Sequence, residues 1–296
     1  MNILVTGADG QLGQALRKVL PRRLKANIIF ADRSHVDITA AESLARFIAD
    51  NDITHIVNCA AYTNVDGAEE DKAACTAVNS DGVKTLAMAA DNYGAKVIHI
   101  STDYVFDGHA YRPYRESDKV NPESHYGATK RQGETALLAL APESIIVRTS
   151  WLYGPDTERN FVGRILAKAK AGDPEGLKVV ADQIGSPTYT YDLAEAIATI
   201  LATPQWFSGV YHFCDAGVCS RYDFAKAILD LSGNSATKLT PISTDNNFLA
   251  ATVAPRPHYS VLDTAKIRLT YGVKTPHWHD SLTQCILQIQ NGNTIR

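Results

Sequence analysis

The sequence predicts an α/β fold: a doubly wound parallel sheet with a smaller, less regular region that is mostly C-terminal. Three observations support this prediction. In the first half, short β-branched runs alternate with longer amphipathic segments. A glycine-rich turn joins the first such run to the first amphipathic segment. After residue 148, Gly and Pro residues divide the chain into shorter elements.

The first half supplies the strands and helices of the sheet. Strands are predicted at 2–6, 27–32, 55–59, 96–101 and 144–148, and helices at 11–20, 40–51, 68–93 and 126–139. In the helix at 11–20, for example, Leu12, Ala15, Leu16 and Val19 have the spacing of one helical face. Because helices alternate with strands, the strands should be parallel. We therefore predict a Rossmann-like domain in residues 1–150.

The second half, residues 151–296, is predicted to form a separate and less regular region. Helices are expected at 160–171, 191–201, 221–231 and 279–290, and a buried strand at 210–214. We expect the segments near 189–216 to return to the first domain.

The charge balance indicates a small-molecule partner. The 296 residues include 29 Lys+Arg and 32 Asp+Glu, for a net charge of −3, and 45% are hydrophobic. Neither charge forms a long run, so we expect no nucleic-acid and no membrane partner. The sequence shows no secretory leader and no apolar run long enough to cross a bilayer, which predicts a cytoplasmic protein. A homodimer is favoured only because symmetric dimers are common.

The cysteines and histidines indicate neither disulfides nor a metal. The five cysteines are odd in number and widely spread, without a C-x-x-C pair, so we expect reduced thiols. His277, His279 and Asp280 superficially resemble a metal cluster. Positions so close together near a helix start cannot all point inward, and we expect no metal there.

The turn after the first strand is predicted to bind a nucleotide phosphate. Gly7, Gly10 and Gly13 follow the G-x-x-G-x-x-G spacing between a strand and a helix. Such a turn lets backbone N–H groups and the helix N-terminus approach a pyrophosphate. Asp32, at the end of the second strand, would accept hydrogen bonds from an adenosine ribose and favour NAD, whereas Arg33 could neutralise the 2′-phosphate of NADP. The choice between NADPH and NADH therefore stays open.

Tyr126 and Lys130 are the predicted proton-transfer pair. They form a Y-x-x-x-K motif, which places both on one helical face, and a nearby ammonium should lower the pKa of the phenol. Tyr222 and Lys226 have the same spacing. Only the first pair is preceded by a hydroxyl at a strand end, Thr102, where a parallel sheet borders its ligand crevice. We therefore assign catalysis to Tyr126 and a packing role to Tyr222.

These motifs together resemble the extended short-chain dehydrogenase/reductases over essentially the whole chain. Within that superfamily the sequence is most similar to the dTDP-4-dehydrorhamnose reductase family. The segments that carry this likeness are 58–66, 101–106, 148–151, 182–188 and 256–257.

The resemblance implies a role for each site residue. For the cofactor it implies Gly10, Gln11 and Leu12 at the pyrophosphate, Asp37 and Ile38 near the adenine, Ala60, Ala61, Tyr62 and Thr63 along the cleft, and Lys130 at the nicotinamide ribose. For the substrate it implies Thr102 and Asp103 at the sugar, Tyr126 as proton donor, Trp151 beside the sugar and Arg256 at the diphosphate. Simple core packing is the alternative for Trp151.

The implied reaction is hydride transfer from NADPH or NADH to C4 of a 4-keto nucleotide sugar, dTDP-4-dehydro-L-rhamnose, with Tyr126 protonating the oxygen. Related dehydratases have Thr-Asp-Glu where this chain has Thr102-Asp103-Tyr104, which disfavours dehydration. Two alternatives remain: an epimerase or reductase acting on another 4-keto sugar, and a non-catalytic NAD(P)-binding subunit like the regulatory subunit of methionine adenosyltransferase.

Overall fold

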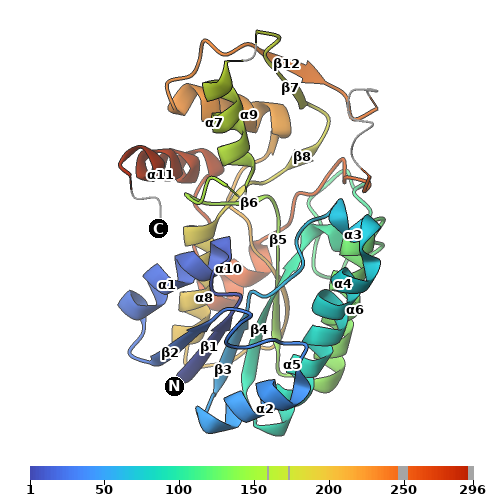
Figure 1. Cartoon of the computed structure of the whole chain (residues 1–296), viewed down its shortest axis with the longest axis vertical. Coiled ribbons are helices and arrows are strands. Elements are labelled where there is room, and N and C mark those ends of the chain that lie inside the picture. The colour runs from blue at the N-terminus through green and yellow to red at the C-terminus, as the bar shows by residue number, and fades with distance from the viewer. Residues whose placement is uncertain (159, 173, 246–252, 293–296) are drawn as a thin grey trace.

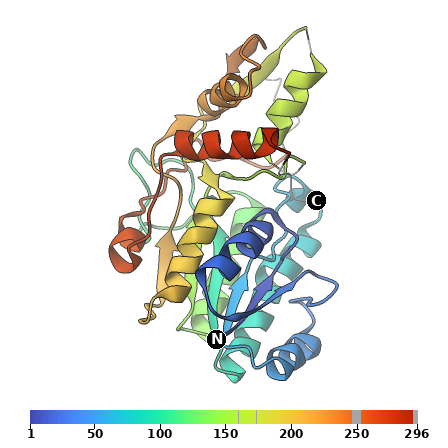
Figure 2. The same ribbon diagram turned by 90° about the vertical axis from the view of Figure 1, so that its left-hand side faces the viewer.

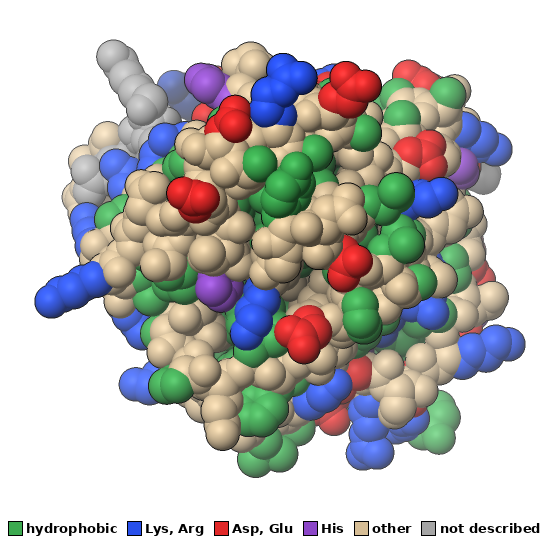
Figure 3. All heavy atoms as spheres, turned by 90° about the horizontal axis from the view of Figure 1, so that it is seen from below, with side chains coloured by type: hydrophobic (Ala, Val, Ile, Leu, Met, Phe, Trp, Pro, Cys, Tyr) green, Lys and Arg blue, Asp and Glu red, His purple; other side chains and the backbone are tan. Residues whose placement is uncertain are grey.

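A computed structural model describes residues 1–158, 160–172, 174–245 and 253–292. A sheet flanked by helices forms the lower part in Figure 1, and a smaller group of helices and short strands lies above the upper edge of the sheet. On the face seen from below, basic and acidic side chains are interspersed with apolar ones (Figure 3). No described helix has the length and apolar character needed to cross a membrane.

The main sheet has six parallel strands in the order β10-β5-β4-β3-β1-β2. Their bounds are β1 Asn2–Thr6, β2 Asn27–Ala31, β3 His55–Asn58, β4 Lys96–Thr102, β5 Ile145–Thr149 and β10 Gly209–His212. The six strands expected from the sequence are confirmed, with ends that shift by one or two residues. Strand order reverses between β1 and β3, and such a switch point is where open α/β sheets bind ligands.

Helices cover both faces of this sheet. One face is covered by α1 (Gln11–Arg23), α8 (Thr190–Ala202) and α10 (Ala265–Tyr271), and Figure 2 shows α1 and α8 side by side in front of the strands. The other face is covered by α2 (Ala41–Asp50), α5 (Gly82–Asn92) and α6 (His125–Leu140). Buried aliphatic side chains fill both interfaces, which gives the α/β architecture that the alternating pattern predicts.

The single helix predicted at 68–93 is wrong. The segment instead forms α3 (Gly67–Glu70), α4 (Lys72–Thr76), a π-helical turn (Ala77–Asp81) and then α5. Asp71 interrupts the segment because its side chain accepts a hydrogen bond from the Ala74 N–H, which starts a new helix. The apolar periodicity continues across both breaks, so periodicity alone could not locate them.

The upper part is built from three helices and pairs of short strands. The helices are α7 (Phe161–Ala171), α9 (Arg221–Leu231) and α11 (Trp278–Gln290), which share an apolar core containing Phe224 and Trp278. The pairs are β6 (Leu152–Tyr153) with β9 (Thr188–Tyr189), β7 (Leu177–Val180) with β12 (Leu239–Ile242), and β8 (Ile184–Gly185) with β11 (Cys219–Ser220). These six strands were not predicted, and four of them have only two residues, which is too few to show a period of two.

Candidate active site

A cavity of about 680 Å³ lies at the carboxyl ends of the strands, lined by residues of the sheet region and of the upper part of the molecule. Its wall combines the turn before α1, the loop after β3, the end of β4, the start of α6 and residues of α7 and α9. Most of the predicted site residues line it; Asp32 and Arg256 are the two that do not.

The glycine turn forms one end of the cavity. Gly7 has φ +63°, and a side chain there would place Cβ 2.7 Å from the Ala60 nitrogen. At Gly13 a Cβ would lie 2.5 Å from the Gly7 carbonyl oxygen. Gly10 caps α1, and a Cβ there would meet only that same oxygen, at 3.2 Å. The backbone is therefore packed closely behind Gly7 and Gly13, while Gly10 faces the cavity together with Gln11 and Leu12.

Asp32 and Arg33, which follow β2, are placed differently relative to the cavity. The Asp32 carboxylate accepts hydrogen bonds from the backbone and hydroxyl of Ser34, both at 2.7 Å, and contacts His35 Nδ1 at 2.9 Å. These hydrogen bonds hold the pKa of Asp32 well below its ordinary value. Arg33 does line the cavity, with its Nε 3.2 Å from Asp37 Oδ2. Arg33 therefore lines the cleft near the glycine turn, whereas Asp32 does not.

The loop from Ala60 to Thr63 lines the middle of the cleft and is held by the π-helical turn. Asn79, in that turn, is completely buried. Its side-chain oxygen accepts from the Tyr62 N–H at 2.9 Å, and its amide nitrogen donates to the Tyr62 carbonyl at 3.0 Å. The π-helical turn, which interrupts the predicted long helix, therefore matters for the site. Its Asn79 side chain holds the loop that borders the cleft.

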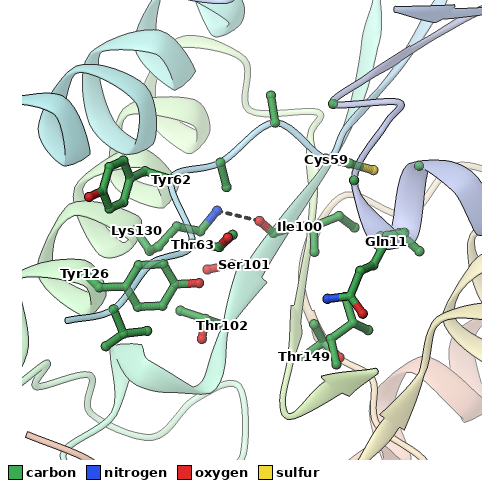
Figure 4. Close-up of a pocket in the computed structure, with 18 of the residues that line it drawn as sticks. Gln11, Cys59, Tyr62, Thr63, Ile100, Ser101, Thr102, Tyr126, Lys130 and Thr149 are labelled. Atoms are coloured by element: carbon green, nitrogen blue, oxygen red, sulfur yellow. Dashed lines mark hydrogen bonds between the residues drawn. The ribbon is translucent and has the colours of Figure 1, made fainter. Parts of the chain in front are cut away.

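Thr102, Tyr126 and Lys130 converge at the other end of the cleft (Figure 4). Thr102 is the last residue of β4, and Tyr126 and Lys130 lie one turn apart at the start of α6. Ser124 begins that helix by accepting a hydrogen bond from the Gly127 N–H at 3.1 Å. A Cβ on Gly127 would lie 2.2 Å from the Tyr104 carbonyl oxygen, so glycine allows α6 to approach the end of β4 closely.

The electrostatics of the pair differ from the sequence-based expectation. Burial raises the pKa of the Tyr126 phenol, and its hydrogen bond with Thr102 lowers that pKa only in part. Lys130 is directed elsewhere: its Nζ donates to the Ile100 carbonyl at 2.7 Å and lies 3.3 Å from His99 Nε2. Burial lowers the pKa of Lys130 to about 8. Desolvation therefore acts against the charged form of both groups.

Asp103 is a buried acid beside this pair. The Thr102 hydroxyl donates to Asp103 Oδ1 at 2.9 Å, and the Tyr104 N–H donates to the Thr102 oxygen at 3.2 Å. Asp103 Oδ2 is buried, and none of the described residues offers it a hydrogen bond of normal geometry. Burial raises the pKa of Asp103 to about 6, against the opposing effect of its hydrogen bonds.

Two arginines that the sequence did not single out line the cavity on the side of the upper part. Arg221 places its guanidinium carbon 3.6 Å from the ring centroid of Trp151, and burial lowers its pKa to about 10. Trp151 lines the cavity with φ +48°, an uncommon conformation for a residue with a side chain. Arg164, from α7, lines the same wall. No spacing in the sequence marks these arginines, which reach the cleft only through the packing of the upper part.

The remaining assignments fall outside the cavity wall. Arg256 donates to Asp66 Oδ2 at 2.6 Å and to the Tyr104 hydroxyl at 3.2 Å, so it contacts the wall through Tyr104. Tyr222 packs against the apolar core of the upper part, and Lys226 forms a salt bridge with Asp230. The packing role predicted for Tyr222 is confirmed. Among the described residues no group of three or more His, Cys, Asp or Glu could hold a metal.

A doubly wound parallel sheet, a glycine turn at its switch point and a Tyr-Lys-Thr constellation define an NAD(P)-dependent oxidoreductase of the extended short-chain dehydrogenase/reductase type. Residues 1–291 match the family described as RmlD substrate binding domain. The chain belongs to this family, that of the dTDP-4-dehydrorhamnose reductases.

Individual relatives agree with this placement. The chain is 39% identical to the dTDP-4-dehydrorhamnose reductase of Aggregatibacter actinomycetemcomitans, covering 95% of this chain and 96% of the relative. The crystal structure of a dTDP-4-dehydrorhamnose reductase from Clostridium acetobutylicum has a TM-score of 0.91 and 41% identity, covering 98% of this chain and 100% of that one. The Bacillus anthracis dTDP-4-dehydrorhamnose reductase, solved in complex with NADP, has a TM-score of 0.90 and 35% identity, covering 97% and 99%.

Proposed function

We propose that this chain reduces the 4-keto group of dTDP-4-dehydro-L-rhamnose to give dTDP-L-rhamnose, using NADPH or NADH. The observation that carries the proposal is the convergence of Thr102, Tyr126 and Lys130 at the end of a cleft that starts at a glycine turn. That cleft suits a dinucleotide because its glycine turn, with Gly7, Gly10 and Gly13, lies at the N-terminus of α1, where a helix can face a phosphate.

The catalytic residues act on the proton, while the bound nicotinamide supplies the hydride. Tyr126 holds its phenolic proton in the buried site and gives it to the oxygen at C4 as negative charge develops there. Thr102 fixes the position of that phenol, and Lys130 binds the ribose next to the nicotinamide. Burial of all three side chains excludes water from the proton transfer.

The substrate is held by the upper part of the molecule. Trp151 and Asp103 border the sugar. Arg221 and Arg164 face the diphosphate with their planar, positively charged guanidinium groups. Arg256 adds positive charge from behind Tyr104. This assignment divides the chain into a dinucleotide-binding part, residues 1–150 with the returning segment 189–216, and a substrate part in the remainder of 151–296.

Arg33 favours NADPH over NADH in this proposal. It lines the cleft where the adenosine ribose would lie, while the Asp32 carboxylate is held by Ser34 and His35. The relative from Bacillus anthracis was solved with NADP. We further propose a cytoplasmic enzyme, since all five cysteines are free thiols, and a homodimer on the frequency of such assemblies.

The direct test mixes the protein with enzymatically prepared 4-keto sugar nucleotide and either NADPH or NADH. Oxidation of the cofactor is then followed by absorbance. NMR of the product sugar reports its configuration. A single product reduced at C4 supports the proposal, whereas a product inverted beside C4 without loss of reduced cofactor would identify an epimerase. Bound cofactor with no turnover would identify a binding subunit instead.

A further inference from the structure

Tyr104 connects two groups of the site that are distant in the sequence, the Tyr126 phenol and the Arg256 guanidinium. It lies in the short 3₁₀ turn Asp103–Val105, which follows β4, and it lines the cavity. Its ring meets the ring of Tyr126 edge to face, with centroids 5.5 Å apart and an angle of 78° between the planes. Its hydroxyl accepts a hydrogen bond from Arg256 Nη1 at 3.2 Å. One side chain therefore contacts both the proton donor and a cation assigned to the substrate.

The backbone of Tyr104 is held on two sides. Its N–H donates to the Thr102 hydroxyl oxygen at 3.2 Å, which fixes the turn to the end of β4. Its carbonyl oxygen lies so close to α6 that a Cβ on Gly127 would come within 2.2 Å of it. Gly127 directly follows Tyr126, so this carbonyl packs against the turn of helix that carries the proton donor. The Tyr104 ring is therefore attached to a backbone that cannot shift freely relative to Tyr126.

The Tyr126 ring needs such a fixed neighbour because it borders the cleft. It packs in a small apolar cluster with Ala68 and Cys75, and among the described residues Tyr104 supplies the ring that pairs with it. An edge-to-face contact constrains the tilt of both rings. A phenol can act as general acid only while its hydroxyl stays within hydrogen-bond reach of the oxygen that it protonates. Its tilt therefore matters for the rate.

The hydroxyl of Tyr104 contacts an ion pair. Arg256 Nη2 donates to Asp66 Oδ2 at 2.6 Å, and the Ala254 N–H donates to Asp66 Oδ1 at 3.1 Å. Arg256 does not itself line the cavity, whereas Tyr104 does. The Tyr104 hydroxyl thus joins the ion pair to the cavity wall. Because a hydroxyl is neutral, this hydrogen bond orients the guanidinium without cancelling its charge.

We propose that Tyr104 is a positioning residue for both ends of the substrate: its ring holds the Tyr126 phenol in place, and its hydroxyl holds Arg256 toward the diphosphate. The inference rests on the proposed function, since it takes Tyr126 as the proton donor and Arg256 as a diphosphate contact. The two roles use different atoms of one side chain, so two substitutions can separate them.

Tyr104→Phe removes the hydroxyl and keeps the ring. The KM for the sugar nucleotide should rise about three- to tenfold, while kcat stays within about twofold of wild type because the Tyr126 ring keeps its neighbour. Tyr104→Leu removes the ring as well, and its kcat should fall about 10- to 100-fold. Tyr114→Phe is the matched control and should leave both constants unchanged. The Tyr114 hydroxyl is also hydrogen-bonded, to Asp107 at 2.7 Å, but Tyr114 does not line the cavity.

Two double-mutant cycles test whether Tyr104 acts through its two partners. In an Arg256→Met background, Tyr104→Phe should cause no further rise in KM. In a Tyr126→Phe background, Tyr104→Leu should cause no further fall in kcat. Thermal melting checks that each variant is folded. Additive effects in folded double variants would overturn the proposal, because Tyr104 would then contact the substrate itself or support the fold only.

Binding measurements keep this test separate from that of the proposed reaction. Isothermal titration calorimetry with dTDP needs no turnover, and Tyr104→Phe should weaken dTDP binding about three- to tenfold, but not in the Arg256→Met background.

A second measurement applies to the unaltered protein and does not depend on the variants folding. With selectively labelled tyrosines, nuclear Overhauser contacts should join the ring protons of Tyr104 and Tyr126. Both readouts remain if the 4-keto sugar is not reduced, a result that would refute the proposed function alone. Unchanged dTDP affinity in folded Tyr104→Phe, or absence of the ring contacts, would overturn the role inferred for Tyr104.

Discussion

At the residue scale, the location of two tyrosines distinguishes the proposed catalytic residue from a packing residue. Tyr126 and Tyr222 share the same sequence spacing to a lysine, yet only Tyr126 lines the cleft, with its hydroxyl beside Thr102. Lys226 forms a salt bridge with Asp230 and has no part in the site. The sequence already distinguished the two tyrosines, because Thr102 ends a strand of the sheet and no equivalent hydroxyl precedes Tyr222.

We expect Tyr126→Phe to lower kcat by about two to four orders of magnitude, because the general acid is lost while the ring remains. Binding of NADPH, measured by fluorescence titration, should stay nearly unchanged. Tyr222→Phe is the control and should retain activity, since Tyr222 packs in the upper core. Equal losses in the two variants would contradict the assignment.

Asp103 should make the stability of the protein depend on pH between about 4 and 6. Its pKa is raised in the folded state to about 6, so the folded protein binds the proton more tightly than the unfolded chain. The stability that this proton confers is present at low pH and is lost as pH rises through the folded pKa.

Asp103→Asn removes that dependence, because the amide cannot ionise. Relative to wild type, the variant should gain free energy of unfolding as pH rises from 4 to 7, by about 2–3 kcal/mol. Urea denaturation at several pH values measures the difference. A constant difference over this range would show that Asp103 titrates normally in the folded protein.

Two of the three arginines proposed at the diphosphate, Arg221 and Arg256, can be compared by substitution. Arg221 lines the cleft and stacks on Trp151, whereas Arg256 is bonded to Asp66 and Tyr104. Arg221→Met keeps the packing and removes the charge, and should raise KM for the sugar nucleotide about 10- to 100-fold. Arg256→Met should raise it less. Steady-state kinetics at saturating NADPH decide this, and the opposite order would make Arg256 the principal contact.

At the element scale, the features that position the site are those that disrupt regular periodicity. The strands and the helix at α6 were predictable because their apolar patterns are uninterrupted and their ends carry capping residues such as Ser124. The π-helical turn was not predictable from periodicity, and its Asn79 bonds to the backbone of Tyr62, a residue distant in the sequence. Local propensity does not contain information about such a partner.

The glycine turn before α1 should separate folding from cofactor binding. Gly10→Ala introduces a methyl group that meets only the Gly7 oxygen at 3.2 Å, so the protein should fold, but the methyl faces the phosphate site. We expect NADPH affinity to fall about tenfold or more, as measured by isothermal titration calorimetry. Gly13→Ala, whose Cβ would lie 2.5 Å from the Gly7 oxygen, should instead lower the melting temperature strongly. Unchanged affinity in folded Gly10→Ala would remove this turn from the cofactor site.

At the scale of the whole molecule, the cleft exists only because two regions meet. Asn160, which caps α7, also donates to Gln11 Oε1 at 3.0 Å at the start of α1. Strand β10 and helix α8 return from the later sequence to the main sheet. The strand pattern and the Gly and Pro residues after residue 148 predicted two regions, but no spacing predicted that Arg221 would stack on Trp151 in the cavity wall.

Because the ligand site joins both regions, cofactor binding should stabilise the molecule as one unit. At a concentration 100 times its Kd, NADPH adds about 2.7 kcal/mol to the free energy of unfolding, which corresponds to a rise in Tm of roughly 5 °C for a chain of this size. Differential scanning calorimetry should show one transition that moves as a whole. Asn160→Ala, which removes the contact with Gln11, should reduce the shift without abolishing it. Two transitions, of which NADPH moves only one, would mean that the substrate region folds independently of the cofactor cleft.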